Sequence, residues 1–241
     1  MMEERTAIWI SKNLRDEMNK IRGKITVLYG QPMVGKTISI AILAKILKKE
    51  TGKPAFFVWS DSNLLGEYGD FIKEVSGAET KYVSDDRGLN IVLRALRNKG
   101  EEGEFPYSMV VVDSITGFQE AIMEREGVDS PRVGLLLGRV SQIVAKRFRE
   151  MSAQYGIPTV IIAHQTAIFK PDSPYLGPFA GKTHKPTIVT KALRNTTLLL
   201  YQYVDPQTRK PVWEIEDIRS GKEKVEKFPK GTKLTLEIEI K

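Results

Sequence analysis

The sequence "GQPMVGKT", Gly30–Thr37, lies between an apolar run and a segment with helical periodicity. Its spacing, Gly-x-x-x-x-Gly-Lys-Thr, is that of a loop that binds phosphates through backbone N–H groups and the positive end of the following helix. Gly30 and Gly35 permit tight turns, while Lys36 reaches the β- and γ-phosphates. The Thr37 hydroxyl is the expected ligand of Mg²⁺. We predict ATP and Mg²⁺ as cofactors, bound by Gly30, Gln31, Pro32, Met33, Val34, Gly35, Lys36, Thr37 and Ile38, with Pro32 unable to donate an N–H.

Short apolar runs alternate with helical patterns on both sides of this loop, which is typical of a parallel sheet flanked by helices. The apolar runs predict strands at 24–29, 55–59, 109–112 and 159–163. Helical spacing predicts helices at 37–49, 89–98 and 132–154. From residue 196, "TTLLLYQYV", "VWEIEDI" and "KLTLEIEI" predict antiparallel strands. We therefore predict an α/β fold in a single domain, 1–241, with an N-terminal segment at 1–23 and a β-rich extension of the sheet at 196–241.

The composition excludes several classes of protein. The chain has no cysteine and only two histidines, so disulfide frameworks and thiolate metal sites are excluded. Its start lacks the pattern of a signal peptide and no apolar stretch approaches the roughly 20 residues that cross a bilayer, so an intracellular, cytoplasmic protein is expected. The net charge of +7 favours a polyanionic partner such as nucleic acid. Abundant Lys and Glu also fit the surface ion pairs of a thermophile protein.

The stretch "MVVVDSITG", residues 109–117, places an acidic residue at the end of a buried apolar strand. In phosphate-loop enzymes a carboxylate in this position holds Mg²⁺ or its water, which predicts that role for Asp113. The alternative is an ordinary aspartate that caps the following helix.

Three stretches together, "GKITVLYGQPMVGKT", "VVVDSITG" and "IPTVIIAHQ", resemble the core motifs of the RecA-like ATPases. That superfamily includes the RecA and archaeal RadA recombinases, KaiC and DnaB-type helicases, and the resemblance spans about residues 20–220. It implies a RecA-like core in which Gln165 senses the γ-phosphate. His164 is then its neighbour, or simply a packed or solvent-facing histidine. The short chain resembles the small recombinase paralogs of archaea and the RecA-core single-strand-annealing ATPases of phages and archaeal viruses.

Behind Gln165 lies a long, Gly/Pro-rich loop, 166–187, in the place of the second DNA-binding loop of RecA-like recombinases. Lysines neutralise phosphates and aromatic rings stack on bases. The predicted nucleic-acid contacts are Phe169, Lys170, Tyr175, Phe179, Lys182 and Lys185. A surface loop or a subunit contact is the alternative. The segment 117–134 takes the place of the first DNA loop, with Arg125 and Arg132 as possible contacts diluted by acidic neighbours.

The resemblance also implies a carboxylate that activates water after the second strand, within "WSDSNLLGEYGD" (59–70). The matching position holds Ser62, so Asp61 beside it is the candidate catalytic residue. In DnaB- and KaiC-like members a Lys-x-Arg pair reaches the neighbouring subunit's γ-phosphate. Here Arg219 takes the arginine position while Asp217 replaces the lysine. A surface ion pair is the alternative for Arg219, and Lys191 and Arg194 are its rivals.

The sequence thus leads to a DNA-stimulated ATPase that acts on single-stranded DNA in recombination, repair or replication. Such a protein is expected to form a homo-oligomer, as a ring or filament, and to meet a recombinase or replication partner. Two alternatives stay open. One is a regulatory or assembly module that ATP switches with little hydrolysis. The other is a helicase motor or loader, which predicts closed hexamers.

Overall fold

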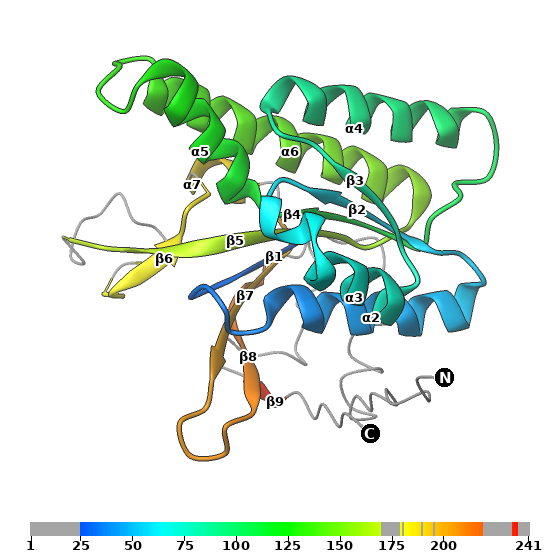
Figure 1. Ribbon diagram of the computed structural model, residues 1–241. Helices are drawn as coiled ribbons and strands as arrows, with labels where there is room; N and C mark the ends of the chain where they lie inside the picture. Colours follow the sequence, from blue (N-terminus) through cyan, green and yellow to red (C-terminus); the bar gives the residue numbers. More distant parts are fainter. Residues whose placement is uncertain are drawn as a thin grey trace.

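The computed structural model describes residues 25–169, 179, 181–188, 190–194, 196–218 and 233–235. A central sheet lies between two layers of helices, with α2 and α3 on one face and α4, α5 and α6 on the other (Figure 1). This arrangement confirms the predicted α/β class. The predicted N-terminal segment, 1–23, lies outside the described residues. Among the helices of the described ranges, none has the length and apolar character needed to span a membrane.

The elements have the following bounds. The helices are α2 (Lys36–Thr51), α3 (Glu67–Ser76), α4 (Asp86–Glu101), α5 (Ile115–Glu126), α6 (Val133–Tyr155) and α7 (Thr190–Leu193), with a 3₁₀ turn η1 (Ser62–Leu65). The strands are β1 (Ile25–Gly30), β2 (Ala55–Trp59), β3 (Glu79–Tyr82), β4 (Met109–Asp113), β5 (Thr159–Ala167), β6 (His184–Pro186), β7 (Leu198–Val204), β8 (Pro211–Ile218) and β9 (Lys233–Thr235).

The sheet has the strand order β3-β2-β4-β5-β1-β7-β8-β9, with β6 added to β5. Strands β3 to β7 along this order pair in parallel. At the far edge β8 runs antiparallel to β7 and β9 antiparallel to β8, as predicted for the C-terminal extension. Because the carboxyl ends of parallel strands share one edge, the segments that follow β1, β2 and β4 and the last residues of β5 gather there.

Each face of the sheet packs against its own core. Successive side chains of a strand point to opposite faces, so Val27 and Tyr29 of β1 pack towards α4–α6 while Leu28 packs towards α2. Three neighbouring strands, β4, β1 and the first five residues of β5, are buried on both sides, which explains why they are almost continuously apolar. The phosphate loop leaves β1 on the α2 side.

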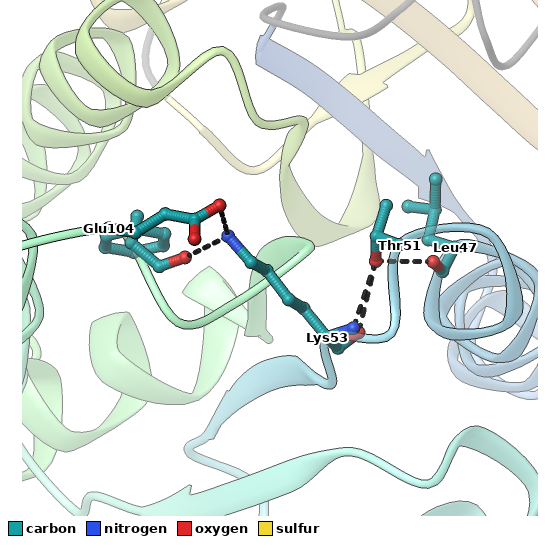
Figure 2. Close-up of polar contacts among 5 residues, drawn as sticks. Leu47, Thr51, Lys53 and Glu104 are labelled. Carbon is teal, nitrogen blue, oxygen red and sulfur yellow. Dashed lines mark hydrogen bonds and ion pairs between the residues drawn. The ribbon is translucent and has the colours of Figure 1, made fainter.

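At the opposite edge of the sheet, a lysine ties the end of α2 to the segment before β4. The Lys53 ammonium donates to a carboxylate oxygen of Glu104 at 2.6 Å and to the Phe105 carbonyl at 2.9 Å (Figure 2). The Thr51 hydroxyl donates to the Leu47 carbonyl, four residues earlier in α2, at 2.7 Å (Figure 2). These contacts border a pocket of about 480 Å³ at this edge, while the polar strand ends lie at the other edge.

Two local predictions need correction. Most of segment 117–134, which takes the place of the first DNA loop, is helical rather than a loop, in α5 and the start of α6. Arg125 is held there by ion pairs with Asp86 at 2.9 Å and Glu126 at 3.1 Å. The loop 166–187 is also not wholly irregular, because β5 runs on to Ala167 and pairs with β6 as a hairpin. Long-range pairing of this kind leaves no periodic signal in the sequence.

Candidate functional site

The phosphate loop, Gly30–Thr37, connects β1 to α2 at the carboxyl edge of the sheet. Gly35 precedes α2 with a φ of 83°, a left-handed conformation that glycine adopts without steric cost. The Lys36 ammonium is buried and donates to two carbonyls of its own loop, those of Gly30 at 3.1 Å and Gln31 at 2.5 Å. Burial lowers the pKa of Lys36 to about 8, against the opposing effect of the Asp113 carboxylate. A phosphate group would replace these carbonyls as the partner of the ammonium.

Asp113 lies at the end of β4 beside the first turn of α2. Its Oδ2 accepts a hydrogen bond from the Thr37 hydroxyl at 2.7 Å. Burial raises the pKa of Asp113 to about 6, although Thr37 and Lys36 both favour the charged form. The residue that caps α5 is Ser114, whose hydroxyl oxygen accepts a hydrogen bond from the Gly117 N–H at 3.4 Å. The peptide bond between Asp113 and Ser114 is cis. The capping alternative for Asp113 is therefore wrong, and its carboxylate faces the phosphate loop.

These two residues fit Mg²⁺. A hydroxyl and a carboxylate are hard oxygen donors of the kind that Mg²⁺ binds together with substrate phosphates. Thr37 and Asp113 bring both donors together at the N-terminal end of α2, and helix ends of this polarity favour anions. The buried carboxylate also keeps a raised pKa, which means that its charge is incompletely compensated by the protein alone.

The end of β2 is tied to the same place. Ser60 donates its N–H to the Asp113 carbonyl at 3.0 Å and its hydroxyl to the Ser114 carbonyl at 2.6 Å. Asp61 follows, and its negative charge acts on both Asp113 and His164. The structure thus brings the candidate water-activating carboxylate to the phosphate-loop edge.

Tyr68, in the first turn of α3, is a site residue that sequence reasoning missed. Its hydroxyl is a hydrogen-bond partner of Thr37, and burial together with the charge of Asp113 raises its pKa. Its side chain is still 42% exposed, so it borders the Thr37–Asp113 pair at the surface. The only sequence signal was its position shortly after β2, which does not distinguish it from other surface tyrosines.

His164 and Gln165 lie where β5 passes the phosphate loop, since His164 pairs with Gly30 in the sheet. The His164 N–H donates to the Thr116 hydroxyl at 3.0 Å and its carbonyl accepts from Thr187 at 2.9 Å. Burial and the nearby Lys36 charge lower the pKa of His164. The Gln165 Oε1 atom is buried without a hydrogen-bond partner among the described residues. A buried amide with unused hydrogen-bonding capacity suits a residue that contacts a ligand.

The β5–β6 hairpin carries the predicted nucleic-acid contacts, and they differ in exposure. Phe169 is 94% exposed and Lys185 is partly exposed on β6. Lys170 and Tyr175 lie outside the described residues. The hairpin is extended by a bond from the Ile168 N–H to the Thr183 carbonyl at 2.9 Å.

Phe179 and Lys182 do not have the surroundings that were predicted. The Phe179 side chain is 1% exposed and packs edge-on against Tyr29, so its prediction as a base-stacking residue is wrong. The Lys182 ammonium forms an ion pair with Glu216, a buried carboxylate of β8 that also accepts from the Tyr29 hydroxyl. Its charge is already neutralised within the protein. The aromatic and basic composition of the segment could not predict these contacts, because Tyr29 and Glu216 belong to the distant strands β1 and β8.

Three residues are candidates for contacting the nucleotide of a neighbouring copy, and the structure describes the side chain of one of them. Arg219 lies outside the described residues, as does the side chain of Lys191. Arg194 is exposed immediately after α7.

With β1 between β5 and β7, the phosphate loop leading into α2, and polar residues ending β4 and β5, the architecture is that of a RecA-like P-loop core, which confirms the predicted fold. A solved structure described as the crystal structure of the RadB recombinase aligns with 88% of this chain and 86% of its own. The TM-score is 0.55 and the sequence identity 18%, so this likeness shows the fold alone. No family model and no curated protein matches the chain.

Proposed function

We propose that this protein binds ATP with Mg²⁺ and hydrolyses it to ADP and phosphate, and that single-stranded DNA stimulates the reaction. The observation that carries the proposal is the contact between Thr37 and Asp113, at 2.7 Å, beside the buried Lys36. This arrangement combines phosphate donors, a cation for the β- and γ-phosphates and oxygen ligands for a metal. Recombination, repair or replication is the setting that this chemistry and fold support.

Each residue has a defined task in this reaction. Backbone N–H groups of the phosphate loop and the start of α2 hold the phosphates. Lys36 exchanges its loop carbonyls for phosphate oxygens, and Thr37 and Asp113 hold Mg²⁺, which when bound neutralises charge that develops on the phosphoryl group. Asp61 orients the attacking water, and the side-chain amide nitrogen of Gln165 donates to the γ-phosphate.

The same strand that carries Gln165 continues into the hairpin, which supports a route from ATP to DNA. Gln165 pairs with Pro186, and Thr166 with Lys185, so the γ-phosphate sensor and a DNA-facing lysine are neighbours in one ladder. Phe169 is exposed at the end of that ladder. A change in the position of Gln165 would therefore move both candidate DNA contacts.

The test is ATP turnover with Mg²⁺, measured with and without single-stranded DNA. Turnover that rises with DNA supports the proposal, and Lys36→Ala is expected to remove both ATP binding and turnover. Lys185→Ala should reduce the stimulation without reducing turnover in the absence of DNA. No ATP binding by the wild-type chain would contradict the proposal as a whole.

A second candidate is a module that ATP switches without appreciable turnover. It is favoured by Ser62, which begins η1 in the position where the resemblance implies a carboxylate. If this candidate is right, the Asp61→Ala variant binds ATP as the wild type does, and the turnover of both proteins is negligible. A measurable turnover that falls steeply in Asp61→Ala decides for the ATPase.

We also propose that ATP stabilises a homo-oligomer, with a cation from a neighbouring copy completing the site. Arg219, Lys191 and Arg194 are the candidates. A sizing experiment with and without a nonhydrolysable ATP analogue tests this, since the analogue is expected to increase the apparent mass. Charge-removing variants at the three positions would then identify which residue abolishes turnover while leaving ATP binding intact.

A further inference from the structure

Gln202 lies at the point where β7 meets the phosphate loop. The pairing of β7 with β1 reaches Tyr201 and Tyr29, so the next residues along, Gln202 and Gly30, are neighbours. The Gln202 side chain is fully buried. A methyl group on Gly30 would lie 2.1 Å from the Gln202 carbonyl oxygen. The backbone of β7 therefore approaches the loop so closely that only glycine fits at its first position.

The side-chain amide of Gln202 is held in one orientation. Trp213 lies opposite Gln202 in the β7–β8 ladder, and its indole Nε1 donates to Gln202 Oε1 at 2.7 Å. Because an indole N–H can only donate, this bond assigns the amide oxygen to Trp213 and leaves the amide nitrogen as a donor. That nitrogen donates to the carbonyl of Val34, inside the phosphate loop, at 2.6 Å.

This second bond fixes the direction of an N–H group within the phosphate loop. The Val34 carbonyl and the Gly35 N–H belong to one planar, trans peptide unit, so they point in opposite directions. Holding the carbonyl towards Gln202 aims the Gly35 N–H away from Gln202. An anion-binding loop needs converging N–H groups, and a carbonyl turned inwards would repel a phosphate. Gly35 also has the left-handed φ of 83° that this peptide orientation accompanies.

We propose that Gln202 is a positioning residue for the phosphate loop and that Trp213 holds the Gln202 side-chain amide in its orientation. The pair fixes the Val34–Gly35 peptide in the orientation that binds phosphate, and so links the β7–β8 hairpin to nucleotide affinity. This inference rests on the proposed function, because it requires that the loop binds the phosphates of ATP.

The decisive variant is Gln202→Met, which preserves side-chain length and apolar packing but removes the donor. The dissociation constants of Mg·ATP and of inorganic triphosphate are both expected to rise about tenfold, the effect of losing one well-placed buried hydrogen bond. Triphosphate is included because it has no base or ribose, so a rise in its dissociation constant reports on the loop itself. Trp213→Phe, which retains a ring but frees the amide to rotate, is expected to raise both constants about threefold.

Leu200→Val is the matched control. Leu200 lies two residues earlier on β7, is 2% exposed and packs in the core on the same face. This variant should lower the thermal unfolding midpoint and leave both dissociation constants unchanged, which separates positioning from general stability. If the wild-type chain binds neither ligand, the proposed function fails. If the wild type binds and the folded variants at Gln202 and Trp213 bind equally well, the inference is overturned. Should Gln202→Met not fold, unchanged affinity in Trp213→Phe alone overturns it.

Discussion

Asp113 makes the stability of the nucleotide-free protein depend on pH. The folded protein raises the pKa of this carboxyl from 3.8 to about 6, chiefly through burial. Between those values the folded state binds more protons at Asp113 than the unfolded chain, so its contribution to stability falls as pH rises. The full difference amounts to about 3 kcal/mol, lost between roughly pH 4 and pH 6.

Asp113→Asn is therefore expected to be more stable than the wild type at pH 7 in EDTA without nucleotide, by up to about 3 kcal/mol. The difference between the two should shrink towards pH 4, in urea unfolding curves recorded from pH 4 to pH 8. Asp70→Asn, at an exposed aspartate of α3, is the control and should show no such trend. A variant less stable than the wild type at pH 7 would mean that the protein compensates the charge fully.

At the level of elements, the close approach of α5 to Ser60, the residue after β2, depends on a helical glycine. A methyl group on Gly117 would lie 2.3 Å from the Ser60 hydroxyl oxygen and 3.2 Å from the Ser60 carbonyl. Ser60 joins the ends of β2 and β4 through its bonds to Asp113 and Ser114. Gly117→Ala should therefore destabilise the fold by about 1–3 kcal/mol, as overpacking does.

Gly134→Ala, in α6, is the matched comparison, since nothing lies within 4 Å of its added methyl group. It should be neutral or stabilising by up to about 1 kcal/mol, because alanine favours helix. Urea unfolding of both variants checks the pair, and equal effects would contradict the close contact with Ser60.

Two phenylalanines of the 166–187 segment should behave in opposite ways. Phe179 is buried against Tyr29, so Phe179→Ala is expected to cost about 3–5 kcal/mol of stability. Phe169 is exposed, so Phe169→Ala should change stability by less than about 0.5 kcal/mol and instead weaken binding to single-stranded DNA. Thermal unfolding and a DNA-binding titration test both. If Phe179→Ala is as stable as the wild type, this part of the segment does not pack against Tyr29 in solution.

Elements with a strong local signal were predictable. The β2 strand, "AFFVW", has the predicted bounds because its apolar run is bordered by Pro54 and polar residues. The β3 strand, "ETKY", was missed because it is an edge strand with alternating exposed side chains and no apolar run. The same division holds at the site. Lys36, Thr37 and Asp113 belong to contiguous motifs, whereas Tyr68 and Gln202 reach the site only through tertiary contacts.

For the whole molecule, a net charge of +7 is not a measure of DNA contacts. Suppose that Lys170, Lys182 and Lys185 all neutralise phosphates. A plot of the logarithm of the affinity for single-stranded DNA against the logarithm of the salt concentration should then have a slope of about −2. If Lys182 stays on Glu216, two contacts give a slope of about −1.4.

Glu216→Gln distinguishes these cases, since it releases the Lys182 charge. The slope is expected to steepen from about −1.4 to about −2 in the variant, measured by fluorescence titration at several salt concentrations. Equal slopes of about −2 in both proteins would show that DNA already displaces Lys182 from Glu216.

The Gln202–Trp213 pair also limits how this sequence can diverge. Loss of one partner alone leaves the other partner's buried polar group unsatisfied, at a cost of about 1–3 kcal/mol. Replacing both with apolar residues removes that cost and leaves the Val34 carbonyl as the group without its donor. Homologous sequences should therefore keep both Gln202 and Trp213 or replace both together. Where both are exchanged, the carbonyl of the residue at position 34 needs a new donor, so a third, compensating substitution near the loop is expected to accompany them.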